Sequence, residues 1–524
     1  MSQISAFEVL GPVMIGPSSS HTAGALRIAL LARSLVSSNI KHVHFILYNS
    51  FARTHNGHGT DRALLAGILG MQTDDYDIKR SFEIADECGL SYEFTYVNEG
   101  EGLHPNTVDI LITDESENTL KIRGVSRGGG RIMLTQINGI DVDLRGDLNT
   151  LFVSHYDRPG VLAETSSCIA EFGINIAFMR SYRQTRGGKA YTIFEVDDVI
   201  DDKTIDAIKN IDNVLNAASV VVPGAITVPG STVECDFISG AELLELTEKL
   251  DKKISGVMYQ REVNLTEEKL AQDKMWRVLK IMKEETHYPI EHPEKSLGGL
   301  IGGESQKVFQ SLGKYKGFLS PLSHKAVAYA MAVLERSATM GLIVAAPTAG
   351  ASGIVPGCLI AAQEEFGFSD QEIFDALYTA AALGYLFTRN ASVSGAEGGC
   401  QAETGSAGAM AAAALVELMG GSPAQSLQAA SIAIANSLGL VCDPIAGLVE
   451  APCQMRNASM VSSAIAAALL ALSGATSPVP FDETAEVMLR VGKALPTSLR
   501  ETAEGGLAQA PSAIEACRAC GICS

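Results

Sequence analysis

The sequence predicts a multidomain α+β protein. Its 524 residues suit about three domains, and the hydrophobic pattern changes twice along the chain. Residues 1–147 mix helical and strand periodicity, residues 148–224 run in the order βαββαβ, and residues 230–524 are almost wholly helical. We therefore expect an N-terminal α+β domain, a small βαββαβ domain and an all-helical C-terminal domain.

The N-terminal region combines a helix with strands. AGALRIALLARSLV has the spacing of an amphipathic helix, whereas KHVHFILYNS and NTVDILITD alternate like strands. The glycine-rich turns NGHGTD and RGGGRI separate these segments. This mixture predicts an α+β domain.

The middle region contains alternating strands and helices. In order they are LFVSHYD, RPGVLAETSSCIAEFG, INIAFMRSYRQ, KAYTIFEVDD, IDDKTIDAIKNI and AASVVVP, of which the second and fifth are helices. This order is the ferredoxin-like split motif. HYDRPGVLAE and FGINIAFM resemble the ACT domain, a regulatory module that senses amino acids. The resemblance implies an effector site formed by His155, Asp157, Gly160, Val161 and Asn175. Ordinary turn chemistry is the alternative, because proline at a helix start and glycine at a helix end need no ligand.

The C-terminal region is a series of helices joined by glycine-rich loops. The helical segments are SGAELLELTEKL, LTEEKLAQDKMWRVLKIMKEE, HKAVAYAMAVLERSATMG, SDQEIFDALYTAAALGYLF, GSAGAMAAAALVELMGG, PAQSLQAASIAIANSLG and ASMVSSAIAAALLALSGA. Alanine lets helices approach closely, which favours a compact bundle. The last segment, residues 458–475, falls short of the ~20 strongly apolar residues that span a membrane. We expect it to be buried in the helical core.

Composition excludes several classes of partner. The formal charge of −20 and the absence of any run of Lys and Arg argue against nucleic acid and anionic membranes. Ten cysteines without a secretory start indicate a reducing cytoplasm, where clustered thiols bind metal more often than they pair.

Three cysteines of the C-terminal half are flanked by glycine or proline: Cys400 in GGCQAETG, Cys442 in LVCDPIAG and Cys453 in APCQMRNA. Each thiol is therefore expected on a turn. Three thiolates can hold a cubane iron-sulfur cluster and leave one iron open to act as a Lewis acid. Any one of these cysteines alone is better explained as an ordinary buried cysteine than as a metal ligand. The three together favour a metal centre.

The segment GPSSSHTAG leads directly into the first helix. An N-cap needs one hydroxyl, and this segment offers more, so we predict a cradle for a carboxylate at the helix start, with His21 directed at the same place. The cradle residues are Ser18, Ser19, Ser20 and Thr22.

GHGTD places His58 between two glycines, three residues before Asp61, which is a further substrate-binding candidate. If Asp61 reaches the second ring nitrogen, the imidazole is oriented and made more basic. A loop histidine in solvent is the alternative.

APTAGASGIVPG joins two helices and presents backbone N–H groups that suit an anion. A flexible connection is the alternative. NASVSGAEGGC then places polar groups close to Cys400. The substrate-binding candidates in these two loops are Thr348, Gly350, Ser352, Asn390 and Ser394, and Ser392 and Glu397 lie in the same stretch.

These motifs together resemble the iron-sulfur-dependent L-serine dehydratases (L-serine ammonia-lyases). The resemblance rests on GPSSSHT, GHGTD, ERSATMGLIVAAPTAGASGIVPG, SGAEGGCQAETG and VCDPIAGLVEAPCQMRNA, and it covers nearly the full chain. It implies a [4Fe–4S] cluster on Cys400, Cys442 and Cys453, and catalytic histidines at His21 and His58. It further implies conversion of L-serine to pyruvate and ammonia, a role in gluconeogenesis, and a cytoplasmic homodimer. Ala25 and Arg389 depart from the family pattern without touching these residues.

In this interpretation His58, or alternatively His21, removes the Cα proton while the open iron binds the β-hydroxyl. A pyridoxal-phosphate enzyme is the alternative, because LKIRG around Lys121 resembles a Schiff-base site. Lys121 lies in a strand pattern, however, so we expect no pyridoxal phosphate. A cysteine-directed lyase, an electron-transfer protein and a non-catalytic amino-acid sensor are further alternatives.

The tail ACRACGICS carries three more cysteines. It either begins a second cluster or folds back so that one thiolate caps the open iron. In related enzymes a cysteine near the last residue caps the open iron. This favours Cys523, with Cys517 and Cys520 as reserves.

Overall fold

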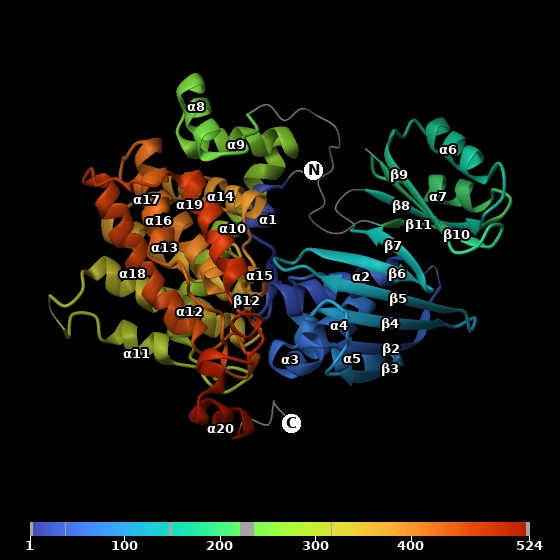
Figure 1. Cartoon of the computed structure of the whole chain (residues 1–524), viewed down its shortest axis with the longest axis horizontal. Helices are drawn as coiled ribbons and strands as arrows, with labels where there is room; N and C mark the ends of the chain where they lie inside the picture. The colour runs from blue at the N-terminus through green and yellow to red at the C-terminus, as the bar shows by residue number, and fades with distance from the viewer. Residues whose placement is uncertain are drawn as a thin grey trace. The chain divides into compact units, whose positions relative to one another are not determined.

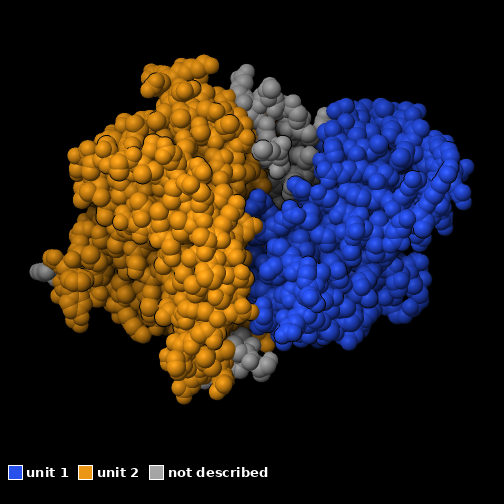
Figure 2. All heavy atoms as spheres, viewed as in Figure 1, with its two compact units in different colours: residues 1–3, 20–55, 60–232 blue, residues 4–19, 56–59, 233–524 orange. Residues whose placement is uncertain are grey.

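The computed structural model of the protein describes residues 4–36, 38–145, 149–196, 198–220, 235–315 and 317–519. The predicted domain boundaries at 147/148, 224 and 230 lie outside these ranges. Contacts divide the chain into two compact units (Figure 2), which are described separately. Within the described ranges, unit 1 comprises residues 20–55 and 60–232, and unit 2 comprises residues 4–19, 56–59 and 233–524.

Unit 1 contains a six-stranded sheet with helices packed against it (Figure 1). The strands are β2 (Ile40–Tyr48), β3 (Ser91–Val97), β4 (Thr107–Asp114), β5 (Thr119–Ser126), β6 (Ile132–Ile137) and β7 (Ile140–Leu144). Their order is β3-β2-β4-β5-β6-β7, and only β2 and β3 pair in parallel. The helices are α2 (Gly24–Ser34), α3 (Ser50–His58), α4 (Thr60–Leu69), η2 (Tyr76–Arg80) and α5 (Ser81–Cys88).

The packing of α2 on this sheet follows from residue size. Val43, Phe45 and Leu47 alternate along β2 and are fully buried, as a strand with one inward face requires. A Cβ carbon at Gly124 of β5 would lie 2.3 Å from Ile28 Cγ2. Only glycine therefore allows α2 to lie this close to β5.

The second sheet of unit 1 confirms the predicted βαββαβ order. Its elements are β8 (Thr150–Tyr156), α6 (Val161–Glu171), β9 (Ile176–Arg183), β10 (Lys189–Val196), α7 (Asp202–Lys209) and β11 (Val214–Val220). The antiparallel strand order is β11-β8-β10-β9. Leu151, Phe194, Ile169 and Ile208 form its buried core between sheet and helices.

Unit 2 is predominantly helical. Its helices are α1 (Ala6–Val9), α8 (Gly240–Leu250), α9 (Ile254–Leu265), α10 (Glu268–Glu291), α11 (Glu304–Gln310), α12 (Pro321–Ala338), α13 (Ile354–Phe366), α14 (Asp370–Asn390), α15 (Gly395–Gly398), α16 (Ser406–Leu418), α17 (Pro423–Ala435), α18 (Cys453–Leu472), α19 (Phe481–Ala494) and α20 (Pro511–Ala519). Short turns add η3 (Ala349–Ala351), η4 (Gln401–Gly405), η5 (Ile445–Gly447), η6 (Thr497–Leu499) and η7 (Gly506–Gln509). The π-helical turn η1 (Ser19–Ala23) leads from unit 2 into α2.

Unit 2 also contains a two-stranded ribbon that the sequence did not predict. β1 (Val13–Ile15) pairs antiparallel with β12 (Leu342–Val344). The ribbon gives the backbone of residues 13–15 its hydrogen-bond partners, which explains why residues 4–19 group with the helical unit.

The apolar helix α18 is only partly buried, although the sequence predicted a buried core helix. It packs against α12, α16 and α17, yet Leu469 and Leu470 are 63% and 46% exposed. In the part of the chain that the structure describes, it is the one helix whose length and composition alone would allow it to cross a membrane.

Candidate functional site

The three cysteines lie at the ends of short, irregular segments of unit 2. Cys400 directly precedes the π-helical turn η4, and Cys453 is the first residue of α18. Cys442 is held from both sides, because its N–H donates to the Leu499 carbonyl (2.9 Å) and its carbonyl accepts from Glu501 N (2.8 Å). All three side chains are buried.

The three thiols lie close enough for their charges to interact. Burial raises the pKa of Cys442 and of Cys453 well above the ordinary value, and in each case the other nearby thiols add to the shift. Burial, followed by the charge of Glu403, raises the pKa of Cys400 to about 11. Without a metal these thiols are therefore protonated, and binding a metal must release protons.

This donor set fits a cubane cluster better than a single ion. Among the described residues, no three His, Cys, Asp or Glu side chains converge tightly enough to hold one metal ion. In a cubane cluster each cysteine binds a different iron, so the sulfurs stand further apart than the ligands of one ion. The three buried thiols are near enough for their charges to interact but too far apart to bind one ion, as a cubane cluster requires.

Buried polar side chains fix the loops that carry the cysteines. Asn457 Nδ2 donates to the Gly350 carbonyl (2.8 Å) and to the Cys453 carbonyl (2.9 Å). These bonds connect the loop predicted to bind an anion, APTAGASGIVPG (the anion loop), to the start of α18. Glu450 accepts from Ser296 Oγ and Gly298 N. The anion loop and one cysteine are therefore parts of one rigid assembly.

Two carboxyl groups beside the thiols had not been identified as site residues. Burial raises the pKa of Glu403 to about 7, and burial together with the charge of Glu403 raises the pKa of Glu501 to about 8. Both groups also influence the Cys442 and Cys453 thiols. Glu403 is part of QAETG, three residues after Cys400, and that spacing was the available signal. Glu501 comes from a distant segment, and no sequence pattern indicates it.

His21 lies in the π-helical turn that starts α2. Its Nδ1 lies 3.0 Å from Ser20 Oγ and its Nε2 lies 2.8 Å from Ser50 Oγ, so two hydroxyls orient the ring. Phe51 packs edge-on against it. π-helical turns are concentrated at functional sites. The remaining residues of the predicted cradle, Ser18, Ser19 and Thr22, are also buried.

His58 ends α3 and is 1% exposed, which lowers its pKa to about 4 because burial disfavours the charged ring. Asp61, which was expected to orient His58, is bound elsewhere. Its Oδ2 lies 2.6 Å from His55 Nδ1 and accepts from Tyr96 OH at 2.9 Å. The aromatic ring of Tyr96 also stacks on His55. The sequence could not distinguish the two histidines, which are three residues apart on one helix.

The other predicted substrate-binding residues differ in their surroundings. The Thr348 hydroxyl lies beside Glu403, and Gly350 faces the same carboxyl group. Ser352 Oγ donates to the Ala349 carbonyl. Ser394 precedes Gly395, whose position borders Cys442. Asn390 is exposed and donates to the Ile238 carbonyl, a contact that stabilises the fold.

The predicted effector residues of the βαββαβ domain have internal partners. His155 is buried, with Nε2 2.8 Å from Thr192 Oγ1. Asp157 accepts from Arg183 Nη1 and Gly187 N. Gly160 has a φ of 97° and Val161 begins α6, and Asn175 directly precedes β9.

Of the tail cysteines, Cys517 lies on α20. Cys520 and Cys523 lie outside the described residues. Helix α20 packs against η5, the turn between Cys442 and Cys453. The described part of the tail therefore ends beside the loop that carries two of the three cysteines.

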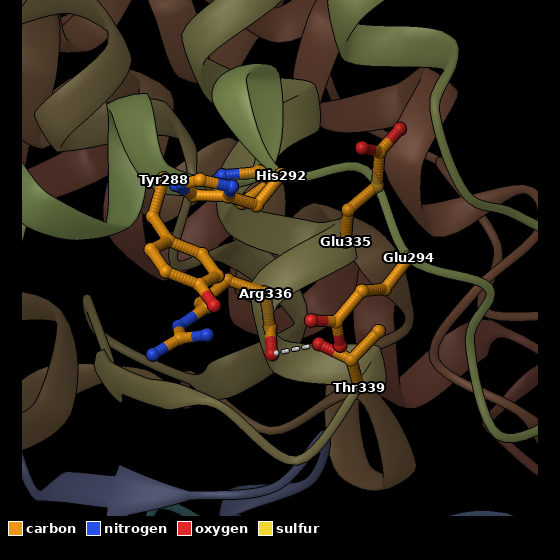
Figure 3. A pocket seen from close by; sticks show the side chains of 7 residues that line it. Tyr288, His292, Glu294, Glu335, Arg336 and Thr339 are labelled. Atoms are coloured by element: carbon orange, nitrogen blue, oxygen red, sulfur yellow. Dashed lines mark hydrogen bonds between the residues drawn. The ribbon is translucent and has the colours of Figure 1, made fainter.

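Figure 3 shows a separate pocket between α10 and α12. The Arg336 guanidinium lies over the Tyr288 ring, 4.1 Å from its centroid, and Tyr288 packs on His292. None of the predicted site residues is among the described residues that line it.

Comparison with known proteins assigns each part of the chain. Residues 5–137 match the serine dehydratase beta chain, residues 149–213 the ACT domain and residues 246–508 the serine dehydratase alpha chain. The first and last of these matches contain the histidine and cysteine motifs, respectively.

Named relatives cover single regions or the whole chain. The probable L-serine dehydratase alpha chain of Bacillus subtilis is 45% identical over 277 residues, which are 52% of this chain and 92% of that one. The L-serine dehydratase of Streptomyces coelicolor is 30% identical over 526 residues, which are 96% of this chain and 98% of that one. That of Mycobacterium tuberculosis is 31% identical over 96% of this chain and 97% of its own length. With two of these relatives aligned over nearly both full lengths and three regions matched in order, the chain belongs to the L-serine dehydratase family, in a single-chain form with an internal ACT domain.

Proposed function

We propose that this protein converts L-serine to pyruvate and ammonia with a [4Fe–4S] cluster held by Cys400, Cys442 and Cys453. The observation that carries the proposal is the group of three buried, mutually interacting thiols on loops fixed by Asn457 and Glu450. When bound, the cluster supplies Lewis acidity to the β-hydroxyl group that leaves.

The protein's own residues provide the remaining steps. His58 is buried and neutral, so it accepts the Cα proton without first losing one of its own. Loss of hydroxide, which leaves as water, gives aminoacrylate, and hydrolysis of its imine tautomer yields pyruvate and ammonia. The proposal offers two candidates for binding the substrate carboxylate: the backbone N–H groups of residues 348–350, and the hydroxyls at the start of α2.

The experiment is deamination of L-serine by protein purified without oxygen, followed by pyruvate and ammonia release. We expect equal amounts of both products and a broad brown iron-sulfur absorption.

A narrow Schiff-base band would instead support a pyridoxal enzyme. Lys121 argues against that alternative, because it is exposed on β5 and lies 3.5 Å from the Asp109 carboxylate. L-cysteine as a competing substrate tests the cysteine-directed lyase.

His58→Ala tests the role of the base. We expect iron content and serine binding to remain while turnover falls by about 100-fold or more. His21→Ala is the comparison, and a larger loss of turnover there would transfer the role of base to His21. Loss of iron in His58→Ala would make that histidine structural.

The remaining expectations belong to the same proposal. The ACT domain binds an amino-acid effector near Asp157 and Gly160, the protein acts as a cytoplasmic homodimer, and its product enters gluconeogenesis. Cys523 caps the open iron, which the packing of α20 against η5 supports.

A further inference from the structure

Glu403 lies in a space that two glycines leave open. A Cβ carbon at Gly395 would be 3.0 Å from Glu403 Oε2 and 3.0 Å from Cys442 Sγ. A Cβ carbon at Gly350 would be 3.2 Å from the same oxygen. Side chains at either glycine would therefore press on the carboxyl group, and the Gly395 position borders both this carboxyl group and a cysteine ligand of the proposed cluster.

Among the described residues, the polar neighbour of the Glu403 carboxyl group is the uncharged Thr348 hydroxyl, and no cationic side chain is bonded to it. In the part of the chain that the structure describes, no lysine, arginine or histidine forms an ion pair with it. The nearby Arg456 donates instead to Asp443 Oδ1 (2.6 Å) and to the Val441 carbonyl (2.9 Å). An acidic residue before a helix often caps backbone N–H groups, but none of the described backbone groups donates to this carboxyl group.

The surroundings favour a cationic ligand. Glu501 and Cys442 lie near Glu403, whereas the nearby guanidinium of Arg456 is paired with Asp443, so acidic groups outnumber available cations around this carboxyl group. The ammonium nitrogen and the hydroxyl oxygen of serine are joined through only two carbon atoms. A group that binds the ammonium would therefore have to lie within a few ångströms of the iron that takes the hydroxyl. Glu403 lies close to Cys442, which would hold one iron of the proposed cluster, and so meets this condition.

We propose that the Glu403 carboxylate binds the α-ammonium group of the substrate and so selects α-amino acids over α-hydroxy acids. This assignment rests on the proposed function. It also explains why Glu403 lies on the π-helical turn that follows Cys400, because one rigid turn then fixes both a cluster ligand and the substrate-binding group.

The test compares L-serine with glycerate, which keeps the carboxylate and the β-hydroxyl but has a hydroxyl in place of the ammonium. Binding is measured by the change each ligand causes in the cluster spectrum. The parent binds serine more tightly, and Glu403→Gln reduces that preference by about tenfold or more, as loss of a charged hydrogen bond requires. Iron content must stay at the parent level. Glu501→Gln is the matched control, because it removes a neighbouring carboxylate by the same change.

Several results would overturn the assignment. An unchanged preference in Glu403→Gln, a larger loss in Glu501→Gln, or loss of iron in Glu403→Gln would each do so. If Glu403→Gln does not fold, Glu403→Asp replaces it, and it must weaken serine binding more than glycerate binding. A parent that neither holds iron nor binds serine contradicts the proposed function itself.

Discussion

Two serine hydroxyls fix the ring of His21, one at each nitrogen. Ser50 contributes the shorter contact from the first turn of α3. A hydroxyl can donate or accept a hydrogen bond. The Ser50 hydroxyl can therefore keep its hydrogen bond to His21 whether or not the facing ring nitrogen carries a proton. We infer that Ser50 is a positioning residue for His21.

Ser50→Ala is expected to lower serine turnover by roughly tenfold or more and to shift its pH profile, while Ser50→Thr restores both. Steady-state rates across pH measure this. Ser91→Ala is the control, because Ser91 Oγ lies 3.0 Å from Nδ1 of His42 at an exposed strand. An equal loss in both variants would show that the effect is not specific to His21.

The buried His58 predicts a pH dependence. Its folded pKa of about 4 lies below that of a histidine in the unfolded chain. As pH falls below about 6.5, the unfolded chain takes up a proton that the folded one does not, so stability decreases. His58→Gln is therefore expected to flatten the fall in melting temperature between pH 7 and pH 5. Parallel curves for parent and variant would contradict the burial of a neutral ring.

The cysteines and histidines could be proposed from the sequence because their residue types carry chemistry and glycines flank them. It did not pair Asp61 with His55, and it did not identify Glu501. Both depend on contacts that the fold makes: Tyr96 joins Asp61 from a separate strand, and Glu501 reaches the site through the backbone of Cys442.

At the level of elements, regular helices and strands followed from periodicity, whereas η1, η4 and the β1–β12 ribbon did not. A π-helical turn has no periodic signature of its own, and a three-residue strand is too short to show one. Both π-helical turns contain candidate site residues. The elements that the sequence missed are therefore among those that position the site.

A partly exposed charge cluster joins α10, α12 and α13. His287 Nε2 lies 2.8 Å from Glu364 Oε1, and Tyr329 OH donates to Glu364 Oε2 at 2.7 Å. The bond to Glu364 raises the pKa of His287. Burial favours a higher pKa for Glu364, but the bonds from His287 and Tyr329 outweigh it and lower that pKa to about 2.

These shifts define the pH window in which the pair stabilises the helices. The contribution of His287 is complete below its unfolded pKa and is lost as pH rises through its raised folded pKa. The contribution of Glu364 is complete above its unfolded pKa and is lost as pH falls through its lowered folded pKa. We expect His287→Gln to destabilise the protein by up to about 1 kcal/mol near pH 5.5 and by less at pH 8.5. Urea unfolding at both pH values measures this, and an equal loss at both would contradict it.

At the scale of the whole molecule, the described tail returns to the candidate site through α20 and η5. A capping tail competes with substrate and protects the open iron. A chain that ends at Pro511 is therefore expected to have a lower KM for serine and a shorter half-life in air. Cys523→Ala tests the proposed capping residue without removing α20. If both variants match the parent in KM and in aerobic half-life, the tail does not cap the iron.

The three-part organisation of the chain followed from the change in periodicity, but the grouping of residues 4–19 and 56–59 with the helical unit did not. That grouping depends on pairing between segments more than 300 residues apart, such as Val13 with Val344. No local pattern contains such information.

The most direct test of the central claim is the iron and acid-labile sulfide content of protein purified without oxygen. The parent is expected to contain about four of each per chain, as one cubane cluster requires, and Cys442→Ala is expected to lose most of both. Cys358→Ala is the matched control, because Cys358 is an equally buried cysteine on α13 whose thiol lies 3.9 Å from the Val461 carbonyl. Full iron and sulfide in Cys442→Ala, or equal loss in Cys358→Ala, would contradict the assignment of the three cysteines to a cluster.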